Sequence, residues 1–228
     1  MKKIVFLVSG SGGSLKFLHS ALERMNINAK IIGILSDRNC LALDFANQKK
    51  IYSKQIKYNQ NYVIELQDEL DFLNPDLIIT NIHKIIDEGT LNRFPDKFIN
   101  LHYSLLPSYK GYIGMKTVLK AKEDNVGFIG GTCHLVNKEV DGGKIIQQGC
   151  FSVDWNNVDN VIDTVFKTSC LCLLEGAIGR LGLDKEVGRE QLVFNNSIVY
   201  FSPKLSVGDF NFDDSFWSLI NNNESLIF

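Results

Sequence analysis

The stretch that decides the fold reads KIVFLV at residues 3–8 and SGSGGS at residues 9–14. After its lysine the first part is wholly apolar, which is typical of a strand buried on both faces. The second part is typical of a tight turn, and Leu15, Leu18 and Leu22 follow it at helical spacing. A buried strand that passes through a glycine-rich turn into a helix predicts the first half of a strand–helix–strand unit.

The same alternation continues along the first half of the chain. Apolar runs at residues 30–35, 77–80 and 98–101 predict three further buried strands, and a shorter strand is expected at residues 51–54. Helical spacing of apolar residues separates several of these runs. Repeated alternation of this kind predicts right-handed crossovers in an open sheet. The expected fold class is therefore α/β, with a Rossmann-like, mostly parallel twisted sheet flanked by helices.

The pattern changes in the second half of the chain. Residues 127–136 and 144–153 are typical of two strands, and residues 159–181 are typical of one long helix. After residue 190 the composition turns to Asn, Phe, Ser and Asp, with short strand-like pieces. A small C-terminal tail rich in β structure is therefore expected after the main sheet.

Composition and charge exclude several classes of protein. The 228 residues are 45% hydrophobic and 22% charged, as in an ordinary globular domain. Lys and Arg number 24 against 26 Asp and Glu, so the net charge of −2 offers no overall basic field for nucleic acid. No apolar run approaches the roughly 18 residues that a membrane span needs. Five cysteines, an odd number without a C-x-x-C pair, predict free thiols, no metal site and a cytoplasmic location.

The turn at residues 10–14, which we call the glycine turn, has two interpretations. A dinucleotide-binding G-x-G-x-x-G motif would need Gly10, Gly12 and a third glycine where Leu15 stands. Backbone N–H groups at the start of a helix nevertheless suit a phosphate or another anion. A tight turn that needs positive φ would account for the glycines equally well. The turn alone leaves ligand contact and plain turn open.

The segment NLHYSLLPSYKG, residues 100–111, carries the clearest chemical pattern. Asn100 and His102 are two residues apart at the end of an expected strand, so their side chains share one face. An amide can stabilise a developing oxyanion and an imidazole can move a proton. Asp141, in a polar loop, would supply a carboxylate that orients the imidazole. The pattern is compatible with an acyl-transfer site, or with a core histidine and an unrelated turn.

Together these motifs resemble the folate-dependent formyltransferases, which use N10-formyltetrahydrofolate. The family pattern Asn-x-His-x-Ser-x-Leu-Pro-x-x-x-Gly, then a strand histidine and an Asp-Gly-Gly loop, is matched by Asn100, His102, Ser104, Leu106, Pro107, Gly111, His134 and Asp141-Gly142-Gly143. The resemblance implies direct transfer of the formyl group to a primary amine, without a covalent enzyme intermediate. It also implies a formyltransferase catalytic domain over residues 1–182 and a small C-terminal extension with a β-hairpin over residues 183–228.

The resemblance assigns roles residue by residue. Asn100, His102 and Asp141 would form the catalytic triad, with Ser104 and His134 supporting it without reacting. The formyl donor would contact Ile82, His83, Lys84, Ile86, Leu105, Val136 and Val140. The acceptor would contact Gly10, Ser11, Gly12, Gly13 and Tyr109. No metal is implied.

The nature of the acceptor divides the family. The tail at residues 198–206 resembles the segment after the core of the tRNA and amino-sugar enzymes, and the short chain then favours the sugar N-formyltransferases. The expected acceptor is a nucleotide-linked 4-amino-4,6-dideoxyhexose, used for the O-antigen of lipopolysaccharide. Phosphoribosylglycinamide formyltransferase of purine biosynthesis is the alternative, although its Gly-Asn-Gly-Ser-Asn phosphate loop reads Gly-Ser-Gly-Gly-Ser here. A second alternative is a formyltetrahydrofolate hydrolase.

Partners are expected to be small molecules. The charge balance and the absence of long apolar runs indicate neither nucleic acid nor membrane as a partner. Apolar residues in the tail, namely Phe210, Phe212 and Trp217, allow a homodimer if they are exposed.

Overall fold

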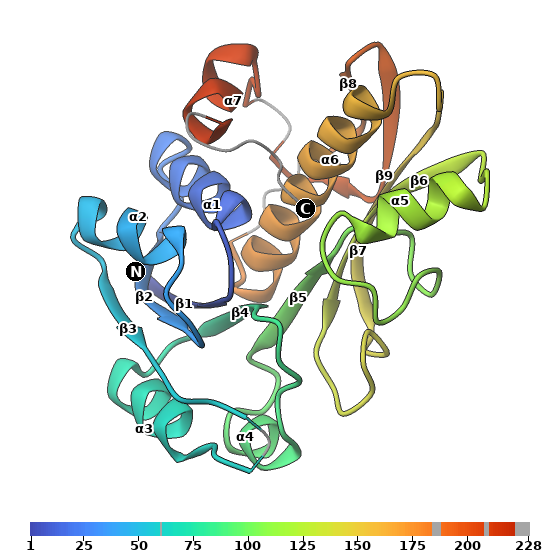
Figure 1. Ribbon diagram of the computed structural model, residues 1–228. Coiled ribbons are helices and arrows are strands. Elements are labelled where there is room, and N and C mark those ends of the chain that lie inside the picture. Colours follow the sequence, from blue (N-terminus) through green and yellow to red (C-terminus); the bar gives the residue numbers. More distant parts are fainter. Residues whose placement is uncertain (60, 184–187, 208–209, 222–228) are drawn as a thin grey trace. The chain divides into compact units, whose positions relative to one another are not determined.

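The computed structural model describes residues 1–59, 61–183, 188–207 and 210–221 (Figure 1). These residues form two compact units. Unit 1 contains Met1–Ile99 and the described residues from Phe210 onward, and unit 2 contains the described residues between Asn100 and Asp209. Each unit has its own strands and helices, so each is described by itself.

Strands and helices alternate through most of the chain, as the sequence predicts. In chain order the elements are β1 (Lys2–Val8), α1 (Gly13–Arg24), β2 (Ala29–Ser36), α2 (Leu41–Lys49), β3 (Tyr52–Gln55), α3 (Ile64–Leu73), β4 (Leu77–Asn81), α4 (Glu88–Arg93), β5 (Phe98–His102), α5 (Lys116–Glu123), β6 (Phe128–Leu135), β7 (Ile145–Ser152), α6 (Val158–Arg180), β8 (Arg189–Phe194), β9 (Ser197–Leu205) and α7 (Asp214–Asn221).

Unit 1 is built on parallel strands in the order β3-β2-β1-β4. Strand β1 lies inside this sheet, where Ile4 pairs with Ile31 on one side and with Leu77 on the other. Its five residues from Ile4 to Val8 are buried, which explains why the run is apolar without alternation. Strand β5 begins in this unit, where Thr80 donates a hydrogen bond of 3.2 Å to the Ile99 carbonyl. The predicted fold class is confirmed.

The C-terminal helix α7 closes unit 1 by packing its aromatic side chains against α1. Phe17 of α1 stacks on Trp217 with ring centroids 5.2 Å apart and meets Phe216 edge to face at 5.7 Å. Trp217 and Phe212 are buried, because they fill the apolar stripe of α1. These two buried side chains offer no exposed apolar surface for the homodimer, which stays a prediction.

Unit 2 is built on antiparallel strands in the order β6-β7-β9-β8. The hairpin β8–β9 turns at Asn195 and Asn196, whose φ angles of 48° and 63° match a two-residue hairpin turn. These strands are the expected β-rich tail. Residues 184–187 lie outside the described residues, and the division of the chain at residue 182 stays a prediction.

The long helix α6 covers β6 and β7 within unit 2, and three of the five cysteines are buried on α6 and β6. Cys133, Cys170 and Cys172 are free thiols and fully buried, as expected for small apolar side chains. Burial raises the pKa of the Cys133 thiol to about 12, so this thiol stays protonated. Among the described residues no helix has the length and apolar character to cross a membrane.

Three short helices, α4, α5 and α7, were not predicted. Helix α4 has a recognisable start, because the Asp87 carboxylate accepts a hydrogen bond of 2.8 Å from the Thr90 N–H. Helix α5 has no side-chain cap, and its apolar pattern covers only two turns. Short helices of this kind are marginal in isolation and depend on packing that the sequence does not display.

Candidate active site

Strand β5 presents Asn100 and His102 on one face, and the side chains of β6 and of the following loop meet them there. Asn100 Nδ2 lies 3.3 Å from His134 Nε2 and donates a long hydrogen bond of 3.5 Å to Asp141 Oδ1. His102 Nδ1 lies 3.4 Å from Asp141 Oδ2. The structure therefore brings together the three residues of the expected triad and His134. We call these four residues the catalytic cluster, and all four belong to unit 2.

The loop that carries Asp141 is fixed by its backbone. Asp141 has a positive φ of 50°, and the Gly142 N–H bonds back to the Glu139 carbonyl at 3.1 Å. Gly143 passes so close to β6 that an added Cβ would lie 1.7 Å from the Leu135 carbonyl oxygen. Two glycines after the aspartate are therefore a steric requirement of this loop.

Hydrogen bonds hold Asp141 in its charged form. Burial alone would raise the pKa of this carboxyl group. The His134 ring, the Gly111 N–H at 2.8 Å from Oδ2 and the nearby His102 ring all lower the pKa, and together they outweigh burial. The pKa of Asp141 is consequently lowered. The carboxylate is ionised at neutral pH and faces the His102 ring.

His102 lies between two hydrogen-bond acceptors. Its Nε2 is 3.0 Å from the Tyr109 carbonyl oxygen, and its Nδ1 faces the Asp141 carboxylate. Burial lowers the pKa of His102, although Asp141 and the Tyr109 carbonyl act in the opposite direction. A neutral ring satisfies one of these acceptors and an imidazolium satisfies both. The geometry therefore equips His102 to accept a proton and to hold it between two partners.

His134 of β6 contacts two other members of the cluster. Its Nδ1 donates to the carbonyl oxygen of its neighbour Leu135 at 2.8 Å, and its Nε2 lies 3.3 Å from Asn100 Nδ2 and 3.7 Å from Asp141 Oδ1. The side chain is almost fully buried. His134 therefore lies beside both Asn100 and Asp141, and the supporting role expected for it stays a prediction.

The loop after His102 depends on a buried residue that the sequence analysis missed. Thr132 of β6 accepts a hydrogen bond from the Leu106 N–H at 3.1 Å and donates to the Ser104 carbonyl at 2.7 Å. Ser104 itself donates to the Ser108 carbonyl at 2.6 Å, so it shapes the loop as expected. Thr132 shares a strand face with His134 two residues later, and that spacing was the available signal.

The predicted acceptor contacts of unit 1 lie at the start of α1. Gly12 has a φ of 81° and precedes the helix without a side-chain cap, and Gly10 is exposed. Ser14 at the end of the glycine turn accepts a hydrogen bond from Asn81 Nδ2. The Ser14 hydroxyl oxygen is thus engaged within the chain. Tyr109, the fifth predicted acceptor contact, lies in unit 2 and donates its hydroxyl to Asp124 at 3.1 Å.

The predicted donor contacts divide between the two units. In unit 1 they occupy residues 82–86, which we call the donor loop: Ile86 is buried, Ile82 half-buried, and His83 and Lys84 exposed. Ser9 anchors this loop, because its hydroxyl oxygen accepts a 2.7 Å hydrogen bond from the His83 N–H. In unit 2 the predicted contacts are half-buried Leu105 and Val136 and exposed Val140. Their contact with the donor stays a prediction.

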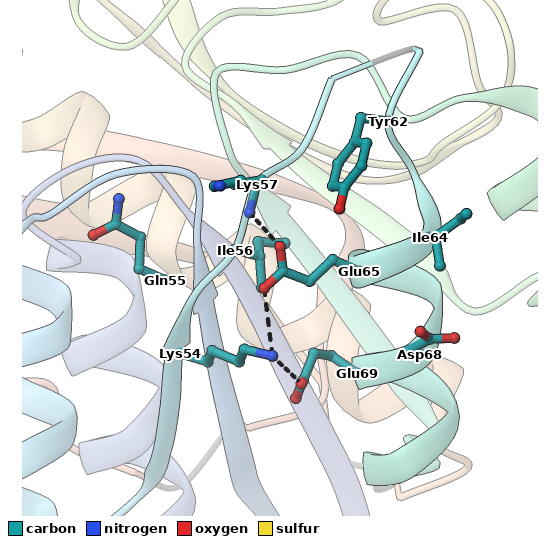
Figure 2. Close-up of a pocket in the computed structure, with 9 residues that line it drawn as sticks. All are labelled: Lys54, Gln55, Ile56, Lys57, Tyr62, Ile64, Glu65, Asp68 and Glu69. Atoms are coloured by element: carbon teal, nitrogen blue, oxygen red, sulfur yellow. Dashed lines mark hydrogen bonds and ion pairs between the residues drawn. The ribbon is translucent and has the colours of Figure 1, made fainter.

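A hollow in unit 1 lies between the end of β3 and α3, and none of the predicted site residues lines it (Figure 2). Lys54 extends across it to Glu69 at 2.7 Å and to Glu65 at 3.4 Å. The Lys57 N–H donates to Glu65 at 2.8 Å. Lys54, Glu65 and Glu69 of this hollow are therefore paired with one another. Among the described residues no group of three or more His, Cys, Asp or Glu side chains is arranged to hold a metal ion.

The Asn-His-Asp cluster has the amide, imidazole and carboxylate that acyl transfer requires, and the chain matches a family with that chemistry. Residues 2–166 match the formyl transferase family, so the chain belongs to that family. Its members use N10-formyltetrahydrofolate as formyl donor. The predictions of an N-formyltransferase and of its donor are confirmed at the level of the family.

The relatives of known name include formyltransferases and a deformylase. A phosphoribosylglycinamide formyltransferase of Haemophilus influenzae is 36% identical over 155 residues, which are 65% of this chain and 72% of that enzyme. A formyltetrahydrofolate deformylase of the same organism is 33% identical over 90 residues, 39% of this chain but only 31% of that protein. The crystal structure of glycinamide ribonucleotide transformylase 1 from Symbiobacterium toebii has the same fold, with a TM-score of 0.72 at 21% identity over 86% of this chain and 92% of that one.

Proposed function

We propose that this protein transfers the formyl group of N10-formyltetrahydrofolate to the primary amine of phosphoribosylglycinamide. The observation that carries the proposal is the intact catalytic cluster in a chain that is 36% identical to an enzyme with that name. The expected amino-sugar acceptor has weaker support, because the relatives described above are a purine-pathway transferase, its structural counterpart and a deformylase.

Formyl transfer to an amine requires three roles of the protein, which we assign to Asn100, His102 and Asp141. The donor supplies a formyl carbon that an unprotonated amine attacks, with a proton leaving the amine as N10 takes one up. Asn100 turns an amide N–H from its long 3.5 Å hydrogen bond with Asp141 to the formyl oxygen as that oxygen becomes negative. His102, between the Asp141 carboxylate and the Tyr109 carbonyl, takes the released proton and is stabilised as an imidazolium. Asp141 remains ionised and offsets that positive charge.

One observation favours a second acceptor class. The glycine turn has no asparagine side chains, and the side-chain donors of residues 10–14 are the hydroxyls of Ser11 and Ser14. Side-chain donors that would bind the phosphate of phosphoribosylglycinamide are therefore few at this turn, and the backbone N–H groups at the start of α1 remain. A nucleotide-linked 4-amino-4,6-dideoxyhexose is the second candidate acceptor on this ground.

An acceptor panel tests the proposal. The purified protein is given N10-formyltetrahydrofolate with phosphoribosylglycinamide, with dTDP- or GDP-linked 4-amino sugars, or with no amine. We expect loss of the formyl donor and appearance of the formylated product with phosphoribosylglycinamide. Transfer to an amino sugar alone would replace the proposed acceptor with the second candidate.

The amine-free reaction separates transfer from hydrolysis. A deformylase releases formate from the donor without an amine, and the family likeness includes such enzymes. We expect little release of formate until an amine is added. Equal consumption of the donor with and without every amine would identify a hydrolase and refute transfer.

A further inference from the structure

One short segment contacts two members of the catalytic cluster through its backbone. The Tyr109 carbonyl oxygen lies 3.0 Å from His102 Nε2, and the Gly111 N–H donates to Asp141 Oδ2 at 2.8 Å. The segment 109–111 therefore contacts both sides of the His102–Asp141 pair. Any displacement of this segment alters the hydrogen bonds of both groups.

The segment has an unfavourable backbone conformation at Tyr109. Its φ of 60° lies in the left-handed region, which is unfavourable for a bulky residue other than glycine. Gly111, with a φ of 78°, bears no such cost. An unfavourable φ persists when the surrounding structure holds the residue in place. The question is which contacts hold Tyr109.

The Tyr109 side chain is tied to the end of α5. Its hydroxyl donates to Asp124 Oδ2 at 3.1 Å, and Asp124 Oδ1 in turn accepts from Lys120 Nζ at 2.7 Å. The ring meets Tyr112 edge to face at 6.2 Å. Burial and the Asp124 carboxylate raise the pKa of Tyr109, so the hydroxyl keeps its proton and remains a donor. We call the bond between Tyr109 and Asp124 the tyrosine tether.

We propose that Tyr109 is a positioning residue whose tether to Asp124 keeps its own carbonyl on His102 and the Gly111 N–H on Asp141. The inference rests on the proposed function in one respect, since it takes His102 and Asp141 as reacting groups. It gives the aromatic side chain of Tyr109 a task at α5 that differs from the acceptor contact expected from the sequence.

Release of the tether has a defined consequence for His102. The groups that face this imidazole are the Asp141 carboxylate, the His134 ring and the Tyr109 carbonyl. Asp141 and the carbonyl favour the imidazolium, whereas burial and His134 disfavour it. If the Tyr109 carbonyl moves away, Asp141 is the one group of these that still favours the imidazolium form of His102. The pKa of His102 then falls further, and the pH range in which the ring holds a proton moves down.

Four variants test the tether. Tyr109→Phe keeps the ring and removes the hydroxyl, and Asp124→Ala removes its acceptor. Asp124→Asn keeps an amide oxygen that still accepts from Tyr109, and Tyr112→Phe is the matched control, because its hydroxyl makes no hydrogen bond within the described part of the chain. Thermal unfolding of each variant first establishes that the fold is retained.

The measurements are kcat, KM for the donor, and the pKa of His102 from ¹⁵N-histidine NMR. The chain has four histidines, so single substitutions assign the signals. We expect Tyr109→Phe and Asp124→Ala to lower kcat about fivefold, the worth of one hydrogen bond, with KM for the donor unchanged and a lower His102 pKa. Asp124→Asn and Tyr112→Phe are expected within about twofold of the wild type.

Two outcomes would overturn the inference. In the first, Tyr109→Phe has the wild-type kcat and the wild-type His102 pKa. In the second, Asp124→Asn is as damaging as Asp124→Ala, which would assign the effect to the Lys120–Asp124 ion pair. The NMR titration needs no substrate, so it decides on the tether even if the acceptor panel finds no formyl transfer. The two proposals can therefore fail separately.

Discussion

The catalytic cluster of unit 2 and the glycine turn of unit 1 are organised in opposite ways. In the cluster each polar side chain is held by a neighbour, and Asp141 alone receives contacts from His102, His134, Asn100 and Gly111. In the glycine turn Gly10 is exposed, and among its side chains Ser14 is bonded to Asn81. The two roles predicted for these regions, chemistry for the cluster and acceptor contact for the turn, are thus assigned to regions of different organisation.

The largest expected effect follows from removal of a cluster side chain. His102→Ala or Asn100→Ala is expected to lower kcat by about two orders of magnitude or more, because proton transfer and oxyanion stabilisation are each worth that much. Ser11→Ala in the glycine turn is the counterpart, and we expect it to raise KM for the acceptor and to leave kcat nearly unchanged. Steady-state kinetics with the acceptor found in the panel measure both. Nearly wild-type rates in both cluster variants would refute the site.

Two glycines, Gly143 in the Asp141 loop and Gly10 in the glycine turn, are expected to differ in how much their replacement lowers the free energy of unfolding. Gly143→Ala is expected to destabilise the protein by about 2–4 kcal/mol, since its Cβ would lie 1.7 Å from the Leu135 carbonyl oxygen and the backbone must shift. Gly10→Ala is expected within about 0.5 kcal/mol of the wild type, because no atom lies within 4 Å of its added Cβ. Urea unfolding compares the two variants. Equal stabilities would contradict the steric account of the Asp141 loop.

A tyrosine in unit 1 provides the next smaller effect. Tyr58 accepts from the Asp87 N–H at 3.0 Å and donates to the Ile85 carbonyl at 3.1 Å, so it fixes the end of the donor loop. Tyr58→Phe is expected to cost about 1–2 kcal/mol of unfolding free energy and to raise KM for the donor. Tyr52→Phe is the control: its exposed hydroxyl bonds to Glu69 at 2.8 Å, and we expect less than about 0.5 kcal/mol. A KM that changes equally in both variants would argue against a special role of Tyr58.

The sequence could predict the fold of unit 1 because the information is local. The sequence of β1 is an unbroken apolar run between a charged start and a glycine turn. The structure has a buried strand over this run and a helix directly after the turn, as predicted. The spacing of Asn100 and His102 likewise predicted a shared face. Family resemblance then connected them with Asp141, which lies 39 positions after His102 and which no local pattern would link to them.

Other features could not be predicted because they depend on backbone atoms or on packing. The contacts of the Tyr109 carbonyl and the Gly111 N–H with the cluster arise from φ angles that no residue type dictates. The sequence left open whether Trp217 and Phe212 are exposed, and packing against α1 buries both. The acceptor is a third case, because the backbone N–H groups that we propose to bind it at the start of α1 depend little on residue identity.

The smallest expected effect is the pH dependence of stability that buried imidazoles confer on each unit. The folded-state pKa of His102 is lowered from the ordinary value of 6.5, mainly by burial, and that of His19 in α1 is lowered for the same first reason. Between the folded and unfolded pKa values the unfolded chain binds more protons, so the free energy of unfolding decreases as pH falls through 6.5. The Asp141 carboxyl, with its lowered pKa, adds a loss only below its ordinary value of 3.8. Urea unfolding at pH 7.5 and 5.5 therefore isolates the imidazoles. We expect His102→Asn and His19→Asn each to reduce the difference between the two pH values, and an unchanged difference in His102→Asn would show that its ring is not held neutral by burial.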